Sequence, residues 1–472
     1  MRAQYAEPAT ALPDHRPVRV TGPRVARLAE QLDGAAAAER DLLVDAFWRE
    51  VAARGAPLVE EMPGAPGHRA VTFLRRGHRA TRQVLFMSNG LVDRDRLADS
   101  RLEHLPGTDI WHLGLRLRAD HRGSYRLAAD ISPGEPPTDP DALQARLRAL
   151  LAHAAPDPLN SRSLPVRWST ADASLFALPQ APAEAWRGRR TPTRAGLVER
   201  HRIPTAALGG ERDVWIYLPP QTSQETSQDK PQQASQQDAQ EHGGDGSLPV
   251  LVLCDGDMWF GRIGLQHSLD ALIAAGTLPP LAVLAPDAVD RRTRGRELGA
   301  RDPFVQFLAD ELLPWAVRHG ALTGDPARTV VAGQSLGGMA ALYAGFQRPD
   351  RFGHVVAQSP SLWWSPELAP GVVQKQIGGV PWLVRRFADA APRPITVHLD
   401  VGLHEGPMVD YSRALHDTLR SAPYRVTRNE FNGGHDYACW HPALLDALAR
   451  LLGPATPATP ARPAQGPVHM KE

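Results

Sequence analysis

Hydrophobic and polar positions follow two different patterns along the chain. Between 24 and 55, apolar residues recur at helical spacing, which predicts short helices. From 69 to 130, short runs rich in β-branched and aromatic residues are separated by Gly, Pro, Asn and Asp, a pattern typical of antiparallel strands. Residues 20–165 are therefore predicted to form an all-β sandwich domain with a helical lead-in.

Beyond about residue 195 the pattern changes to alternating strands and helices. The strand-like runs are short and mostly apolar, as strands covered on both faces are. An alternation of this kind is typical of a mostly parallel sheet flanked by helices, which predicts an α/β domain over 195–455. The predicted strands are 214–220, 249–256, 281–287, 329–335, 354–360, 394–402 and 426–431.

Two segments carry almost no apolar residues. The insert at 221–247 is rich in Gln and Ser, and the tail at 456–472 is rich in Pro. Such segments bury too little surface to offset the entropy lost on ordering, so both are predicted to be disordered. The insert is interpreted as a hairpin loop joining the strands at 214–220 and 249–256.

Charge and cysteine content restrict the class of protein. Lys plus Arg (53) nearly equals Asp plus Glu (52), so no whole-chain field exists to hold nucleic acid or an anionic membrane. Only Cys254 and Cys439 occur, and they are expected to be free thiols. No signal pattern and no run of ~18 apolar residues is visible, so a cytoplasmic location is predicted.

Gly333-Gln334-Ser335-Leu336-Gly337 is a G-x-S-x-G motif between a buried strand and a helix. A serine in such a tight turn takes up strained backbone geometry and exposes its hydroxyl above the sheet. The start of the following helix directs free amides and a partial positive charge at the same place, which suits an oxyanion. Ser335 is therefore the predicted nucleophile of an esterase.

A serine nucleophile needs a neighbouring base and an acid that orients it. His435 lies in the glycine-rich run Asn432-Gly433-Gly434-His435-Asp436 after the last predicted strand, where α/β-hydrolases place the base. The acid is expected after the preceding strand. Glu405, Asp400 and Asp410 compete for this role, and Glu405 is preferred because it lies in the loop after Gly402.

The second oxyanion amide is expected in the loop after the strand that ends at Cys254. The amide of Asp257 or Met258 is a plausible donor beside that of Leu336, because Gly256 permits close backbone approach. Tryptophans also gather on loops next to the catalytic segments, which indicates a flat aromatic substrate as the alternative to ordinary core packing. These residues are Trp259, Trp363, Trp364 and Trp440.

Four arginines fall between Asp290 and Glu297, after the strand at 281–287. Ligands of such sheets bind at the edge where these residues are expected to lie. The run is interpreted either as a solvated loop or as a set of charge-assisted contacts to an anionic substrate.

At these motifs the chain resembles the ferric enterobactin (enterochelin) esterase family, whose members hydrolyse the trilactone backbone of catecholate siderophores. The resemblance covers about 65–165 and 195–450. It rests in the first part on the runs at 71–75, 107–111, 122–125 and 157–160, and in the second on those at 253–256, 294–298, 333–338, 359–364 and 433–440.

The resemblance implies an immunoglobulin-like β-sandwich followed by an esterase-D-like α/β-hydrolase domain, with neither cofactor nor resident metal. It implies Ser335 as nucleophile, His435 as base, Glu405 as acid and Arg294 near the substrate, while Trp259 and Trp364 are expected as further substrate contacts. The partner implied is a small molecule, a ferric catecholate siderophore. Gly406 departs from the family pattern as one extra residue after Glu405.

Two other functions share these motifs. A carbohydrate or feruloyl esterase with a glycan-binding sandwich would carry the same serine motif, since fold does not fix substrate. A catalytically inactive catecholate-binding protein is the non-enzymatic alternative, and the intact Ser335 and His435 contexts argue against it.

Overall fold

The structure is a computed structural model. It describes residues 17–189, 194–220, 247–320, 322–369, 372–374 and 377–453. The predicted insert, except for Ser247, and the predicted tail lie outside the described residues. Among the described residues, no helix is both long and apolar enough to span a bilayer.

The first part of the chain, here called the sandwich region (17–189), contains two antiparallel sheets. One has the order β1-β6-β3-β2, with β5 also paired to β6, and the other has the order β4-β7-β9-β8. The strands of the first sheet are β1 (Val18–Arg19), β2 (Leu58–Glu61), β3 (His68–Arg76), β5 (Glu103–His104) and β6 (Ile110–Arg118). Those of the second are β4 (Gln83–Ser88), β7 (Arg122–Asp130), β8 (Ser163–Leu164) and β9 (Ala173–Ala177).

Inward side chains of both sheets form one aromatic core. Phe73 of β3 lies 4.4 Å from Phe86 of β4 and 5.5 Å from Phe176 of β9, between ring centroids. Period-two alternation places these residues on the facing surfaces of the two sheets, and burial of their large rings holds the sheets together. The predicted two-sheet sandwich is seen, and its immunoglobulin-like classification stays a prediction.

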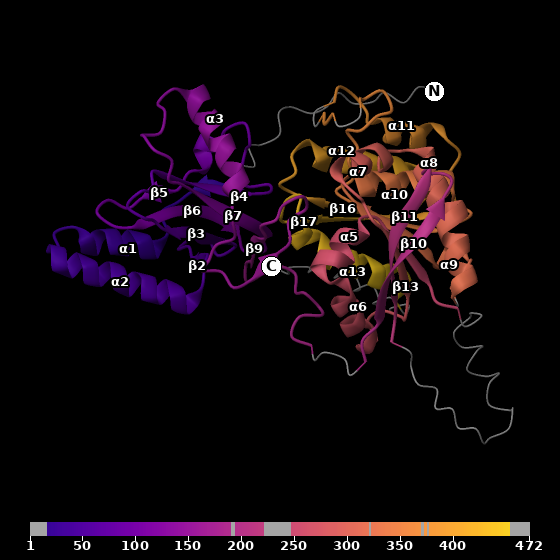
Figure 1. The fold of residues 1–472 in the computed structure, drawn as a ribbon, viewed down its shortest axis with the longest axis horizontal. Coiled ribbons are helices and arrows are strands. Elements are labelled where there is room, and N and C mark those ends of the chain that lie inside the picture. The colour runs from indigo at the N-terminus through magenta and orange to yellow at the C-terminus, as the bar shows by residue number, and fades with distance from the viewer. Residues whose placement is uncertain are drawn as a thin grey trace, which may run out of the picture.

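Helices cover both outer faces of the sandwich (Figure 1). The predicted lead-in helices are α1 (Pro23–Leu32) and α2 (Ala37–Arg54), which pack on the first sheet. On the second sheet packs α3 (Pro140–Leu150), through Leu147 and Leu150. Short 3-10 turns lie at Leu97–Ser100, after β4, and at Leu151–His153, directly after α3.

The second part, here called the α/β region (194–453), is built on one eight-stranded sheet of order β10-β11-β13-β12-β14-β15-β16-β17. From β13 to β17 all neighbours are parallel, while β10 and β11 are antiparallel additions at one edge. The strands are β10 (Leu197–Thr205), β11 (Gly210–Leu218), β12 (Val250–Leu253), β13 (Ala282–Pro286), β14 (Thr329–Gln334), β15 (His354–Gln358), β16 (Thr396–Gly402) and β17 (Arg425–Phe431).

This order corrects one prediction. The strands before and after the Gln/Ser-rich insert, β11 and β12, are not hairpin partners, because β13 lies between them and pairs with both. The connection therefore crosses over β13. The short separation of β11 and β12 in sequence favours a hairpin between them. In the parallel part of the sheet, however, β12 pairs with β13 instead.

Two helical layers cover this sheet. One face packs against α8 (Asp302–Gln306), α9 (Leu313–His319), α10 (Leu336–Gln347), α11 (Trp382–Asp389) and α12 (Pro407–Ser421), and the other against α6 (Leu265–Ala274) and α13 (Tyr437–Leu452). Side chains of β12 alternate between the two layers, Val250 and Val252 to one and Leu251 and Leu253 to the other. The remaining turns are α5 (Gly256–Met258), α7 (Arg291–Glu297), the π-helical Trp259–Ile263 and Phe307–Leu312, and the 3-10 turn Pro326–Arg328.

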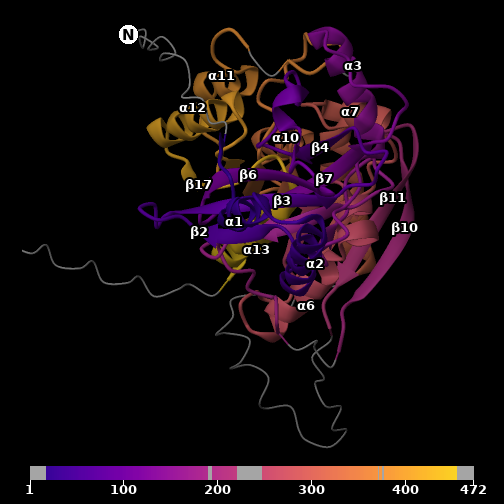
Figure 2. The same cartoon turned by 90° about the vertical axis from the view of Figure 1, so that its left-hand side faces the viewer.

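The sandwich packs directly on the α/β region, and Figure 2 shows its strands in front of the larger sheet. Leu164 and Leu175 of the sandwich belong to the same buried cluster as Tyr437 at the start of α13. The amide of Arg122 donates to the Asn432 carbonyl at 3.0 Å. The sandwich therefore touches the segment in which the predicted base lies.

Candidate active site

Ser335 occupies the sharp turn between β14 and α10. Its backbone has φ 59° and ψ −121°, which a residue with a side chain rarely adopts, so the predicted strained turn is seen. A Cβ at Gly333 would collide with the backbone of Gly337, which explains why the motif needs glycine there. The Ser335 amide donates to the Gln358 carbonyl at 2.9 Å, and its Oγ lies 3.3 Å from the Oγ of Ser361.

His435 and Glu405 meet at the ends of neighbouring strands. His435 Nδ1 lies 2.7 Å from Glu405 Oε2. The other carboxylate oxygen, Oε1, accepts from Ser359 Oγ at 2.6 Å and from the Gly402 amide at 2.8 Å. The Glu405 side chain is only 1% exposed, whereas that of His435 is 37% exposed. Glu405 is thus fixed inside the protein, while His435 reaches solvent.

Trp440 contacts both Ser359 and His435. Its Nε1 donates to Ser359 Oγ at 2.9 Å, and its ring meets the His435 ring edge to face at 4.6 Å. The chain that orients the carboxylate therefore runs from the indole through a hydroxyl to Glu405. Buried hydrogen-bond chains of this kind hold each member in one rotamer.

The other two acid candidates lie elsewhere. Asp400 is buried within β16 and accepts from Gln358 Nε2 at 3.1 Å and from Asn429 Nδ2 at 2.9 Å. Asp410 lies on α12 with its side chain 49% exposed, 3.8 Å from Arg413. Gly406, which the resemblance implies to be an extra residue, has φ +59° and is the N-cap of α12.

The expected oxyanion donors lie at the starts of two helices. As the first residue of α10, Leu336 has an amide that cannot pair within its own helix. Asp257 lies in α5, which follows β12 and begins after Asp255 in left-handed conformation at φ 71°. A Cβ at Gly256 would collide with the Ala285 carbonyl, so only glycine permits this close approach.

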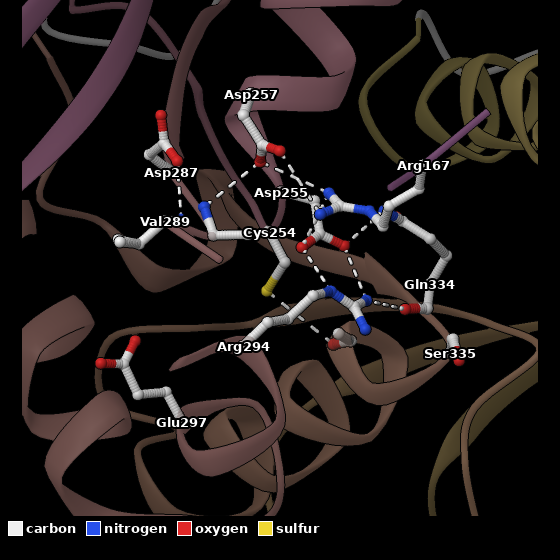
Figure 3. Close-up of polar contacts among 12 residues, drawn as sticks. Arg167, Cys254, Asp255, Asp257, Asp287, Val289, Arg294, Glu297, Gln334 and Ser335 are labelled. Atoms are coloured by element: carbon white, nitrogen blue, oxygen red, sulfur yellow. Dashed lines mark hydrogen bonds and ion pairs between the residues drawn. The ribbon is translucent and has the colours of Figure 1, made fainter. Parts of the chain in front are cut away.

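Asp255 is the centre of a charged cluster shown in Figure 3. Arg294 donates to its two carboxylate oxygens at 2.7 and 2.8 Å, Arg167 lies 3.1 Å away, and Gln334 Nε2 donates at 2.8 Å. Burial alone would raise the pKa of Asp255, but the charges of Arg294 and Arg167 hold it below its usual value. Asp255 is therefore an anion. It connects Gln334, next to Ser335, to the loop at 255–258 in which the second oxyanion amide is expected, here called the oxyanion loop.

This cluster determines where Arg294 points. Its side chain is 11% exposed, and its Nη2 also donates to the Gln334 carbonyl at 3.3 Å. The guanidinium is thus engaged by the protein just behind Ser335. A direct contact between Arg294 and a substrate stays a prediction.

The tryptophans are buried, which corrects the expectation that they line a substrate surface. Trp259 is completely buried, and its Nε1 donates to Gln334 Oε1 at 3.3 Å. Trp364 is packed against Trp382 and under the guanidinium of Arg301. Neither Trp259 nor Trp364 has a free face for a substrate. Burial of such large aromatic rings in the core is favourable because it removes much apolar surface from water.

Sequence reasoning overlooked residues that reach this site from other parts of the chain. The carboxylate of Asp436 caps α13 and accepts from both the amide and the Oγ of Ser124, at 2.9 and 2.6 Å. Burial raises the pKa of Asp436. Ser124 belongs to β7 of the sandwich, so only its presence in the Arg122–Tyr125 run, which carried the family resemblance, could have drawn attention to it.

Both cysteines are free, as expected, and both are buried. Burial raises the pKa of Cys254 and of Cys439, so neither is a ready thiolate nucleophile near neutral pH. Within the described part of the chain, no group of three or more His, Cys, Asp or Glu side chains is placed to hold a metal ion.

Comparisons with known proteins agree over both regions. Residues 70–187 match the family model "Enterochelin esterase, N-terminal" and residues 239–451 match "Putative esterase". The iron(III) enterobactin esterase of Dickeya dadantii is 33% identical and the iron(III) salmochelin esterase of Escherichia coli O6:H1 is 34% identical. Each alignment covers 86% of this chain and 93% of the relative.

Solved structures of similar proteins cover the same span. The ferric enterobactin esterase of Salmonella typhimurium is 28% identical with a TM-score of 0.70, covering 86% of this chain and 98% of the other. The enterobactin esterase of Shigella flexneri, crystallised in the presence of enterobactin, is 26% identical with a TM-score of 0.69, covering 86% and 97%. The α/β-hydrolase-like fold is thereby confirmed.

Proposed function

Since the chain belongs to the enterochelin esterase family, we propose that it is a serine esterase that hydrolyses the ester backbone of catecholate siderophores. The relatives named above act on iron(III) enterobactin and iron(III) salmochelin. The observation that carries the catalytic part is the 2.7 Å contact between His435 Nδ1 and Glu405 Oε2, at the sheet edge where Ser335 stands in its strained turn.

The first half of the reaction forms an acyl-enzyme. Ser335 Oγ attacks the ester carbonyl carbon while His435 Nε2 takes the hydroxyl proton. Glu405 holds the ring through Nδ1 and stabilises the imidazolium that forms. The amides of Leu336 and Asp257 receive the oxyanion. The tetrahedral intermediate then collapses, and His435 returns the proton to the departing alkoxide.

The second half hydrolyses the acyl-enzyme. His435 takes a proton from water, whose oxygen attacks the acyl carbon, and Ser335 leaves with that proton. Each cycle cuts one ester of the lactone. Cutting the backbone removes the covalent link that gives three catechols a high effective concentration around one iron, so the chelate weakens.

The test is Ser335→Ala with ferric enterobactin, followed by mass spectrometry of the linear products. We expect kcat to fall by ~10⁴–10⁶-fold with folding intact by circular dichroism, because this variant has no atom that can form the acyl-enzyme. Covalent labelling by a fluorophosphonate should disappear in parallel. Hydrolysis at close to the wild-type rate would refute serine catalysis.

The same assay distinguishes the substrate classes. Wild-type protein is given a panel of tri-catecholate lactones and feruloyl sugar esters under identical conditions. We expect cleavage of the lactones, and faster cleavage of the feruloyl esters would instead identify a carbohydrate esterase. The cytoplasmic location stays a prediction, tested by cell fractionation.

A further inference from the structure

Non-glycine residues with positive φ gather around one place in this molecule. Among the described residues there are five of them: Trp168, Asp255, Val289, Ser335 and Ser359. Ser335 is the proposed nucleophile, Ser359 donates to the proposed acid, and Asp255 anchors the oxyanion loop. Backbone conformations of this kind persist mainly where function requires them.

The residues directly before Val289 and Trp168 both contact Asp257, which belongs to the same loop as Asp255. The amide of Ala288, directly before Val289, donates to the Asp257 carboxylate at 3.2 Å, and Arg167, directly before Trp168, contacts it at 3.4 Å. Of the five positive-φ residues, Trp168 is the one that the sandwich region contributes.

Trp168 occupies a turn that the α/β region holds in place. The Ser169 amide donates to the Val166 carbonyl at 3.2 Å, which closes the turn with Trp168 at its third position. From the α/β region, Arg262 Nη1 donates to the carbonyls of Val166 and Ser169 at 2.7 and 3.1 Å. Glycine is the usual residue for positive φ at this position, so a bulky side chain here needs a reason.

The neighbouring Arg167 links this turn to the active site. Its guanidinium lies 3.1 Å from Asp255, and its Nε donates to the Tyr437 hydroxyl at 3.3 Å. Figure 3 shows the Arg167 guanidinium lying next to the carboxylates of Asp255 and Asp257. The Arg167 side chain is 12% exposed, so its position is fixed by the protein.

The Trp168 indole covers this arginine and leaves an open surface. Its ring centroid lies 5.0 Å from Arg167 Cζ, within cation–π range. Trp168 is nevertheless 45% exposed, whereas Trp259, Trp363, Trp364 and Trp440 are all buried. The partly exposed Trp168 indole thus packs on the buried guanidinium of Arg167, which contacts Asp255.

We propose that Trp168 is a specificity-determining residue, whose exposed indole stacks on a catecholate ring of the substrate beside Ser335. The inference rests on the proposed function and adds a contact made by the sandwich region. Planar rings stack on aromatic side chains without needing hydrogen bonds, and the cation–π contact with Arg167 holds the indole in place for such stacking.

The test measures binding separately from hydrolysis. In a Ser335→Ala background, the affinity for ferric enterobactin is measured by isothermal titration calorimetry with Trp168, Trp168→Phe, Trp168→Leu and Trp168→Ala. We expect Trp168→Ala and Trp168→Leu to raise Kd about tenfold, equivalent to about 1.4 kcal/mol. Trp168→Phe keeps an aromatic face and should stay within about threefold.

A fourth variant, Trp168→Gly, excludes a folding effect. Glycine accepts positive φ without strain, so the thermal midpoint should not fall while Kd rises as in Trp168→Ala. The matched control is Ile131→Ala, which removes an exposed apolar side chain directly after the last residue of β7. This variant should leave Kd unchanged.

The outcomes separate this inference from the function on which it rests. If the parent binds ferric enterobactin and Trp168→Ala binds it equally well, the stacking role is refuted and the esterase proposal stands. An equal effect of leucine and phenylalanine would also refute it. If the parent does not bind ferric enterobactin, both proposals fail, whereas binding by the parent without cleavage by the wild type refutes only the hydrolysis.

Discussion

Two buried carboxylates flank the Ser335 turn, and the protein holds them in opposite ways. On the His435 flank, Glu405 accepts hydrogen bonds from neutral donors, the Ser359 hydroxyl and the Gly402 amide, besides facing His435. On the Asp255 flank, the carboxylate faces two guanidinium groups, those of Arg294 and Arg167. Both carboxylates are ordered, but only one is already paired with positive charge.

In the proposed mechanism this difference distinguishes a carboxylate that takes part in the reaction from one that holds the structure. Neutral donors fix Glu405 without cancelling its charge, so the charge remains available when His435 becomes an imidazolium. Asp255 already has its charge compensated, which suits a residue that holds the Gln334 end of the turn against the oxyanion loop. Similar side chains thus serve chemistry on one side and geometry on the other.

The sandwich region contributes to both flanks. Ser124 binds Asp436, the residue after His435, and Arg167 binds Asp255. Because these contacts come from two separate segments of the sandwich, its docking determines the position of the base segment and of the oxyanion loop together. Changes on the two flanks should nevertheless have different consequences.

The largest effect is expected on catalysis at the His435 flank. Glu405→Gln keeps the shape and the neutral donors but removes the charge, so kcat should fall by as much as ~10⁴-fold with little change in folding. Initial rates on one ester and circular dichroism measure both. Asp410→Asn is the matched control, because this carboxylate is exposed on α12. A large drop in Asp410→Asn without one in Glu405→Gln would reassign the acid.

Stability should suffer most at the Asp255 flank. Asp255→Asn tolerates the left-handed backbone but leaves the buried Arg294 without its anion and Arg167 with Asp257 alone, which should lower the free energy of unfolding by about 3–5 kcal/mol. Urea unfolding at pH 7 tests this. Asp213→Asn removes a partner of the exposed Arg200 and Arg202 and should cost at most ~1 kcal/mol. Equal losses in the two variants would remove the distinction between the flanks.

Acid should lower the free energy of unfolding through His121, on the His435 flank. Its Nδ1 lies 3.2 Å from Oδ1 of Asn432. Burial, and then the charge of His404, lowers the pKa of His121 from 6.5 to about 3. The folded state therefore binds fewer protons than the unfolded state, so the stability present above pH 6.5 is lost as pH falls toward 3. At pH 5 the loss is about 2 kcal/mol.

The variant that isolates this effect is His121→Gln. Its free energy of unfolding should fall less between pH 7 and pH 5 than that of the wild type, because glutamine does not titrate. The measurement is urea unfolding at both pH values, with His201→Gln, an exposed histidine of β10, as the control. An unchanged pH dependence in His121→Gln would place the acid sensitivity elsewhere.

The smallest effect is expected at the contact between the sandwich and α13. Ser124→Ala removes one of the two hydrogen bonds that Ser124 donates to Asp436, since the backbone amide remains, and should lower the free energy of unfolding by about 1.5 kcal/mol. Ser412→Ala is the control, because this buried hydroxyl has no hydrogen-bond partner among the described residues and its loss should cost little. Equal losses would show that the Asp436 contact contributes nothing specific.

The sequence by itself predicted the strands β11 to β17 of the α/β region, though not β10, together with the strained turn at Ser335 and the position of His435 after the last strand. These features depend on local signals: hydrophobic periodicity, a glycine on each side of the serine, and a glycine-rich turn that follows a strand. Each signal lies within a few residues, so it can be read without knowing which segments meet.

Only the tertiary structure shows that Glu405 contacts His435 while Asp400 and Asp410 pair with other residues, because these contacts depend on how the loop after β16 folds against β17. Burial of Trp259, the engagement of Arg294 by Asp255 and the insertion of β13 between β11 and β12 likewise required the packed molecule. The hydrophobic and polar patterns of the two regions also do not indicate that Arg167 and Ser124 of the sandwich contact residues of the α/β region. The physical reason is that a hydrogen bond or ion pair depends on distances of a few ångströms between groups that the chain separates by tens to hundreds of residues.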